Sequence, residues 1–291
     1  MKFMRYKWLY FLISAIVIVP GVFSLVRWGL KPSIDFTGGT ILELQFPSKN
    51  NAQDAIKETL KELNIDYSSI QSSGENRLLI RTKPISREDA ASIIGTVAVK
   101  VGEKPVELRF DSVGPTLGKE LIRKTIIGIL LASSFILLYV WKQFKEPMFG
   151  VCAILAMFHD SLVLLGSFSL LGHFAGVEID TLYATAVLTI LSFSVHDTVV
   201  VYDRIRESQK KFPGVFFEDL ADKAVTETLS RSVNNSLTII FMLIALYLMG
   251  GSTIKWFVFA LLIGTISGTY SSTFTAVPLL VVWEEIKNRK R

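Results

Sequence analysis

The sequence predicts an α-helical membrane protein with six transmembrane helices and an extracytoplasmic α+β domain between the first helix and the second. Three observations support this fold class. Half of the 291 residues are apolar, and the mean hydropathy is +0.44. Six segments are long and apolar enough to cross a bilayer. The stretch of about 90 residues after the first segment alternates between strand and helix patterns.

A helix needs about 20 apolar residues to cross the hydrocarbon core of a membrane. The six segments lie at residues 8–26, 126–141, 148–171, 182–201, 233–249 and 256–282. The second segment is short, and it needs the preceding residues 121–125 to reach the length of a membrane span. The first follows a basic N-terminus, as a secretory signal would, but no cleavage site follows it, so we expect a permanent anchor.

The predicted domain organisation follows from these spans. Residues 1–28 hold the N-terminus and the first helix, residues 29–120 the extracytoplasmic domain, and residues 121–291 the other five helices, with a cytoplasmic loop at 203–231 and a cytoplasmic tail. The distribution of Lys and Arg sets the orientation. Fifteen of them lie in the N-terminus, the loop between the second and third spans, the loop between the fourth and fifth spans and the tail, against Lys255 alone in the two short loops opposite.

This bias predicts a multi-pass protein of the cell (inner or plasma) membrane with both termini in the cytoplasm. It also explains the net charge of +5 as a topology signal. A nucleic-acid partner would require the basic residues to gather on one patch, and long uncharged runs separate them here.

The extracytoplasmic segment has the pattern of a ferredoxin-like β-α-β-β-α-β domain. Strands are predicted at 40–46, 67–72, 77–82 and 106–110, a turn at 73–76 and a helix at 52–63. A second helix begins at Ser86, with Ser86 as N-cap and Asp89 at its third position. Gly38 and Gly39 predict a turn or bulge before the first strand, because no Gly-Lys-Ser/Thr follows as in a phosphate loop. Without His, Cys or clustered carboxylates, the domain is expected to contact another protein.

Ionisable residues inside the spans are the candidate functional residues. His159-Asp160 lies in the third span, His196-Asp197 in the fourth, and Arg231 opens the fifth. A charge at the centre of a membrane helix costs about 2.5–3.5 kcal/mol, so intramembrane carboxylates commonly form proton or ion relays. Each of these residues also has a simpler interpretation. Either histidine could merely hydrogen-bond a neighbour, and Arg231 could be an interfacial residue whose charge reaches the membrane surface.

Polar residues also recur at helical spacing on two spans. Thr185, Thr189, Ser192 and His196 form one row, and Arg231, Asn235 and Thr238, with Asn234 beside them, form another. We expect these faces to meet in the bundle, where Asp197 and Arg231 would form an ion pair.

Other patterns predict packing. Gly264, Gly268 and Ser272 form a ridge of small residues for close helix contact. Residues 215–230 predict an amphipathic helix on the membrane surface or against the bundle.

An intramembrane protease is the competing chemistry. The sequence lacks a Gly-x-Gly-Asp pair and a Gly-x-Ser nucleophile with a distant His. It also lacks the His-Glu-x-x-His zinc motif, so neither a metal nor a cofactor is expected.

Four motifs together resemble one family. They are Asp35-Phe-Thr-Gly38-Gly39-Thr40, Ser112-Val-Gly114-Pro115, His159-Asp160, and the run from Ser192 to Glu207 that includes His196, Asp197, Asp203, Arg204 and Arg206. Nearly end to end, the chain resembles the SecF family, the smaller subunits of the SecD–SecF protein-export complex.

The resemblance implies half of an RND-type transporter core. It implies SecD and the SecYEG channel as partners, with YajC as a further candidate, and preproteins and membrane lipid as contacts. Such a subunit is not an enzyme: it uses the proton-motive or sodium force for late translocation of preproteins. Asp197 would then be the proton carrier and Arg231 its partner, in a relay with Asp160, His159 and His196. The family commonly has Asn where His196 stands.

Two alternatives remain open at this point. A stand-alone RND-like exporter of small molecules should carry an internal repeat with a second extracytoplasmic domain. A purely structural assembly subunit would use its charges only to fix helix register.

Overall fold

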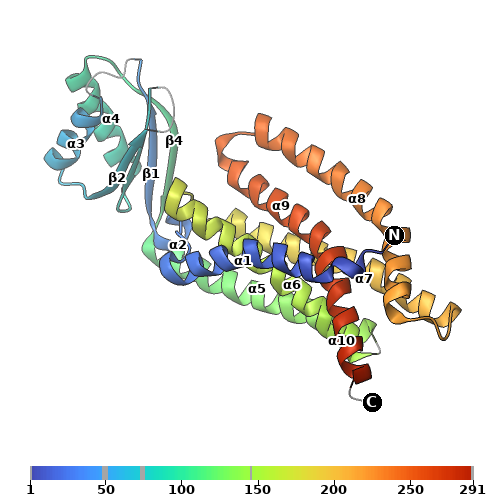
Figure 1. Ribbon diagram of the computed structural model, residues 1–291. Coiled ribbons are helices and arrows are strands. Elements are labelled where there is room, and N and C mark those ends of the chain that lie inside the picture. Colours follow the sequence, from blue (N-terminus) through green and yellow to red (C-terminus); the bar gives the residue numbers. More distant parts are fainter. Residues whose placement is uncertain (1, 48–51, 73–75, 145, 290–291) are drawn as a thin grey trace. The chain divides into compact units, whose positions relative to one another are not determined.

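The computed structural model describes residues 2–47, 52–72, 76–144 and 146–289. The chain forms two compact units. The helical unit comprises Met1–Lys31 and Ile127–Arg291, and the α/β unit comprises Pro32–Ile126 (Figure 1). Helix α5, Pro115–Gln143, belongs to both.

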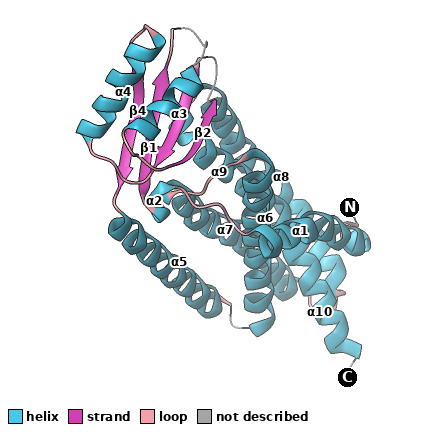
Figure 2. Ribbon diagram, turned by 90° about the vertical axis from the view of Figure 1, so that its left-hand side faces the viewer, coloured by secondary structure: helices cyan, strands magenta, loops and turns pink. Residues whose placement is uncertain are grey.

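The α/β unit has the predicted β-α-β-β-α-β order, preceded by one short helix. Its elements are α2 (Ile34–Thr37), β1 (Gly39–Gln45), α3 (Ala52–Glu62), β2 (Tyr67–Ser72), β3 (Arg77–Thr82), α4 (Arg87–Val101) and β4 (Val106–Val113). The strands pair antiparallel in the order β2-β3-β1-β4. Helices α3 and α4 cover one face of this sheet (Figure 2). The ferredoxin-like prediction is confirmed.

Local patterning explains why these elements form. Leu42 and Leu44 alternate along β1 and are buried with Leu78 and Ile80 of β3 against the helices. The predicted capping box of α4 is present: the Asp89 N–H donates to Ser86 Oγ at 3.1 Å, and the Ser86 N–H donates to Asp89 Oδ2 at 3.0 Å. Residues 73–75 of the predicted turn lie outside the described residues.

Replacing the cap residue tests how much this local signal contributes. Ser86→Ala leaves the first N–H groups of α4 without their side-chain acceptor, which costs about 1 kcal/mol. We expect the amides of α4 to exchange with deuterium about fivefold faster in the full-length protein. Ser92→Ala is the control, because Ser92 is exposed in the middle of the same helix and bonds only to the Glu88 carbonyl. Equal exchange in both variants would contradict the capping role.

Six helices of the described chain are long and apolar enough to span a membrane, as predicted. They are Met4–Trp28, Pro115–Gln143, Pro147–Ala175, Thr181–Lys211, Phe217–Met249 and Thr253–Arg289. The first comprises η1 (Met4–Tyr6) and α1 (Lys7–Trp28), and the next four are α5, α6, α7 and α8. The last consists of α9 (Ser252–Ser271), the π-helical segment η2 (Ser272–Ala276) and α10 (Val277–Arg289).

The helices extend beyond the predicted spans, and this changes two details. Helix α5 starts at Pro115, well before residue 126. The predicted separate amphipathic helix at 215–230 is instead the first half of the unbroken helix α8. Only residues 212–216 connect α7 to α8, at Pro213 and at Gly214, whose φ is +91°. Charged residues do not end a helix, whereas Pro and Gly do.

Small residues bring the central helices of the helical unit close together. A Cβ on Gly21 of α1 would lie 3.0 Å from the Cα of Gly166 on α6. The predicted ridge on the last span is also used: a Cβ on Gly264 would lie 2.3 Å from Ile190 of α7, and one on Gly268 would lie 3.2 Å from the Phe193 ring. These approaches let short polar side chains reach between helices.

Candidate functional site

Asp160 lies at the centre of the helical unit and is 1% exposed. Its Oδ2 accepts hydrogen bonds from Ser194 Oγ on α7 at 2.6 Å and from Ser271 Oγ on α9 at 2.5 Å. Its Oδ1 accepts one from Ser267 Oγ on α9 at 2.6 Å and faces His159 Nδ1 at 3.1 Å. An ionised carboxylate offers about four acceptor positions, so these donors fill them.

His159 extends this cluster to the first span. If Asp160 is ionised, the Nδ1–H of His159 donates to Oδ1 of Asp160. In the neutral imidazole, Nε2 of His159 then accepts a hydrogen bond from the Ser14 hydroxyl. His159 Nε2 lies 3.0 Å from Ser14 Oγ of α1, and Ser14 Oγ lies 3.3 Å from Thr275 Oγ1 in η2. His159 and Ser14 are both buried. The cluster therefore connects α1, α6, α7, α9 and η2.

The serines that bind Asp160 were missed by the sequence reasoning. Ser267 and Ser271 have the i, i+4 spacing of one helix face, and they lie one position before Gly268 and Ser272 of the small-residue ridge. That spacing was the available signal. Ser194 lies three residues before Asp197 on the face of α7 opposite to the predicted polar row, so nothing local indicated its role.

Asp197 is also buried, at 6% exposed, but it has fewer partners than Asp160. Its Oδ2 accepts a hydrogen bond from Ser232 Oγ of α8 at 2.6 Å. The nearest nitrogen of His196 lies 3.9 Å from Oδ1, and the His196 side chain is 73% exposed. The bond from Ser232 is the one side-chain hydrogen bond of Asp197 within the described ranges. Most acceptor positions of this carboxylate are therefore open.

The structure does not bring Asp197 and Arg231 together. Among the described residues Asp197 bonds to Ser232, one position after Arg231 and therefore about 100° further round the helix. Arg231 is exposed and lines a cleft of about 530 Å³ between α7 and α8, together with Asp203, Glu207 and Glu227.

The other charged residues of the fourth-span motif pair around this cleft. Arg204 donates to Glu207 and Glu227, each at 2.5 Å, and Arg206 donates to Asp203 at 3.1 Å. No ion pair of Arg231 occurs in the part of the chain that the structure describes. Its positive charge therefore lies at a cleft that also holds Asp203, Glu207, Glu227 and Arg204, and it has no ion-pair partner among the described residues.

The two predicted polar rows are exposed on the helical unit. Thr185, Thr189, Ser192 and His196 of α7 are all exposed, and Thr185 and Thr189 donate only to their own helix. On α8, Asn234, Asn235 and Thr238 are exposed with Arg231. The rows do not pack inside this chain as expected. Exposed polar groups within a membrane span indicate a partner, because lipid offers them no hydrogen bonds.

The two motifs of the α/β unit meet each other. Gly38 ends α2 with φ +75° and ψ +161°, a conformation that is essentially restricted to glycine. A Cβ there would lie 2.8 Å from the Cα of Pro115, the first residue of α5. Gly39 pairs with Val113, and the Thr40 and Ser112 hydroxyls lie 2.7 Å apart. Asp35 lies in the first turn of α2, and the Cβ position of Gly114 is open.

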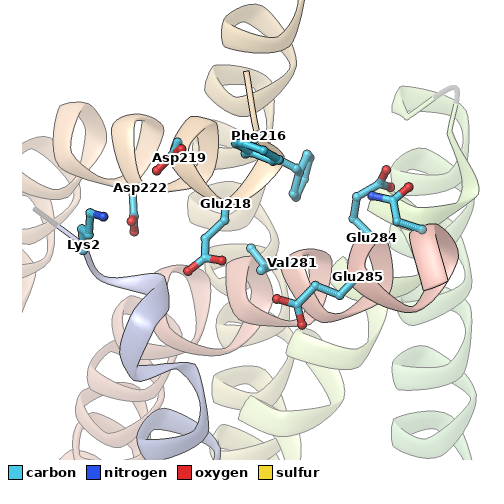
Figure 3. Close-up of a pocket in the computed structure, with 10 residues that line it drawn as sticks. Lys2, Phe216, Glu218, Asp219, Asp222, Val281, Glu284 and Glu285 are labelled. Carbon is cyan, nitrogen blue, oxygen red and sulfur yellow. The ribbon is translucent and has the colours of Figure 1, made fainter. Parts of the chain in front are cut away.

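A second cleft, of about 330 Å³, lies between α8 and α10 (Figure 3). Glu218, Asp219 and Asp222 of α8 and Glu284 and Glu285 of α10 line it, with Lys2. The chain's N-terminal segment closes one side: the Met4 N–H donates to Asp222 Oδ1 at 2.8 Å, and Lys7 pairs with Glu285. Across the described ranges, no three His, Cys, Asp or Glu residues are placed to hold a metal ion.

Comparison with known proteins matches these motifs to one family. The family profile for the C-terminal region of the protein-export membrane proteins SecD and SecF matches residues 93–286, and that for the SecD/SecF GG motif matches residues 23–46. The protein translocase subunit SecF of Thermobaculum terrenum is 42% identical, over 96% of this chain and 93% of that protein. The chain belongs to the SecF family.

Other members and a solved structure agree with this assignment. SecF of Synechocystis is 34% identical, over 100% of this chain and 97% of that protein. The crystal structure of SecDF from Thermus thermophilus, described as a translocon-associated membrane protein, superposes with a TM-score of 0.84 at 31% identity. That match covers 98% of this chain but only 39% of the SecDF chain. The fold is that of an RND-like membrane protein, and the family is one of protein-translocase subunits.

The contact between Gly38 and Pro115 gives a test of the GG motif. Gly38→Ala forces an alanine into a glycine conformation, which costs about 1–3 kcal/mol, and places its Cβ against Pro115. We expect faster deuterium exchange at the β1 and β4 amides of the full-length protein. Gly114→Ala is the matched control, with an open Cβ position, and should change stability by less than about 0.5 kcal/mol. Unchanged exchange in Gly38→Ala would show that the contact does not matter.

Proposed function

We propose that this chain is the SecF-type subunit of a protein-export complex and that it works with a separate SecD chain at the SecYEG channel. The observation that carries the proposal is the pair of polar rows exposed on α7 and α8 within the membrane spans. A chain that worked alone would bury such rows. The size of the matched SecDF chain supports the same view, because this chain corresponds to 39% of it. The missing helices would come from SecD.

The proposed orientation places both termini in the cytoplasm of the cell membrane and the α/β unit outside. The positive-inside bias supports it, since α7 ends with Lys210 and Lys211 and α10 ends with Lys287 and Arg289 in their last turns. The α/β unit would then meet polypeptides as they leave the channel.

Energy coupling would use the carboxylate with open acceptor positions. Asp197 binds one hydroxyl and has the exposed His196 nearby, so it can gain and lose a proton or a sodium ion without dismantling a bonded cluster. Moving one charge through 100 mV releases about 2.3 kcal/mol, enough to shift a two-state helix arrangement about 50-fold. That shift would drive the late stage of preprotein translocation.

The partner assignment can be tested by photo-crosslinking. With a benzophenone amino acid at Thr189, in the α7 row, we expect a covalent adduct to SecD in native membranes. The control is Ile16 of α1, which is 63% exposed and lies on an apolar face that we expect to contact lipid. An adduct from Thr189 to a second copy of this chain instead would favour the stand-alone exporter.

The coupling residue can be tested by export from reconstituted vesicles. Asp197→Asn keeps the shape but cannot exchange a proton, so we expect late translocation to fall to the rate measured without an ion gradient. Glu120→Gln, an exposed carboxylate of α5 that pairs with Lys124 and lines neither cleft, is the control and should keep the parental response. Gradient-driven export that persists in Asp197→Asn would refute the assignment.

A further inference from the structure

The π-helical segment η2 interrupts the last membrane span at Ser272–Ala276. Pro278, the second residue after this segment, has no N–H, so the carbonyl of Phe274, four residues earlier, loses its α-helical donor. π-helical turns are rare and concentrate at functional positions. Between α9 and α10, this segment is the point at which the span can most easily change its hydrogen-bonding register.

Contacts to three neighbouring helices fix both ends of η2. At its start, the flanking Ser271 donates to Asp160 at 2.5 Å. At its end, Thr275 contacts Ser14 of α1, and the Ala276 carbonyl accepts from the Tyr202 hydroxyl of α7 at 2.9 Å. Ser271 and Tyr202 are fully buried. The segment is therefore fixed by specific polar contacts rather than by apolar packing alone.

The same carboxylate and its neighbouring imidazole account for two of these three contacts. Asp160 binds Ser271 directly, and His159 binds Ser14, which contacts Thr275. All four acceptor positions of Asp160 are filled. Asp197 has only Ser232 within the described ranges. The two intramembrane carboxylates thus differ in their bonding and cannot serve the same purpose.

We propose that Asp160 and His159 are positioning residues that hold η2 as a hinge, and that α10 pivots there relative to α9. A rotation of α10 about η2 would change the cleft between α8 and α10. Beyond the hinge, Glu284 and Glu285 line the acidic cleft shared with α8, and Lys7 of the N-terminal segment pairs with Glu285. Rotation of α10 would open or close that cleft. Helix α8 also carries Ser232, the partner of Asp197, so the hinge and the proposed coupling residue act on the same helix.

The distance between two spin labels tests the hinge directly. Phe158 on α6 and Ile286 on α10 are 53% and 51% exposed, and the only native cysteine, Cys152, is buried and can be replaced by Ala. In lipid nanodiscs, Ser271→Ala should raise the population of a second α6–α10 distance about fivefold, the factor expected for the loss of one hydrogen bond.

Ser267→Ala is the matched control. It removes the same kind of bond from the same carboxylate and the same helix, but it does not touch η2. Both variants should lower the melting temperature alike, whereas only Ser271→Ala should change the distance distribution. Equal distributions in the two variants would overturn the proposal and leave a purely structural cluster. If Ser271→Ala fails to fold, Thr275→Val removes the contact at the other end and should give the same second distance.

The functional part of this inference rests on the proposed export role, and the two can fail separately. The spin-label measurement needs neither SecD nor an ion gradient. If the second distance appears in Ser271→Ala but export is unchanged, the hinge exists and its coupling to export is wrong. If Asp197→Asn keeps gradient-driven export, the coupling residue is wrong and the hinge is unaffected.

Discussion

A carboxylate within a bilayer is stable only if its neighbours replace the water it has lost, and the helical unit depends on this constraint at Asp160. Three serines and a histidine surround that one side chain, and they come from α6, α7 and α9. Serine is short, so each donor reaches the carboxylate only if its helix lies close. The glycines that let α9 approach α7 at Ile190 and Phe193 meet that requirement. Close packing and charge satisfaction therefore depend on each other.

The α/β unit could be predicted from the sequence almost residue by residue. The strand expected at 40–46 is found at Gly39–Gln45, and the capping box at Ser86 and Asp89 is present. The patterns involved are local: alternation over one strand, helical spacing over one helix, and caps. Hydropathy likewise located all six spans, but it misplaced their ends, because α7 and α8 continue past the apolar residues until Pro213 and Gly214 interrupt the chain.

The candidate site was only half predictable, for a geometric reason. An ionisable residue in an apolar run is conspicuous, so Asp160 and Asp197 could be found. Helical periodicity then shows which residues share a face of a helix, but it does not show which neighbouring helix that face contacts. An error of one residue, about 100° of rotation, separates the expected partner Arg231 from the observed partner Ser232. The polar rows were expected to meet inside the bundle for the same reason, and they are exposed instead.

The close crossing of α1 and α6 has a consequence for how the protein is made. Gly21 lies against Gly166, and the Ser24 and Ser169 hydroxyls lie 2.7 Å apart, yet more than 100 residues and the whole α/β unit separate the two helices in the chain. During synthesis, α1 must wait in the membrane with Ser14 and Ser24 lacking their partners until α6 has been inserted. Because the rest of α1 is apolar, the helix can stay in the membrane before α6 is inserted. Assembly of the buried cluster thus begins only after most of the polypeptide has left the ribosome.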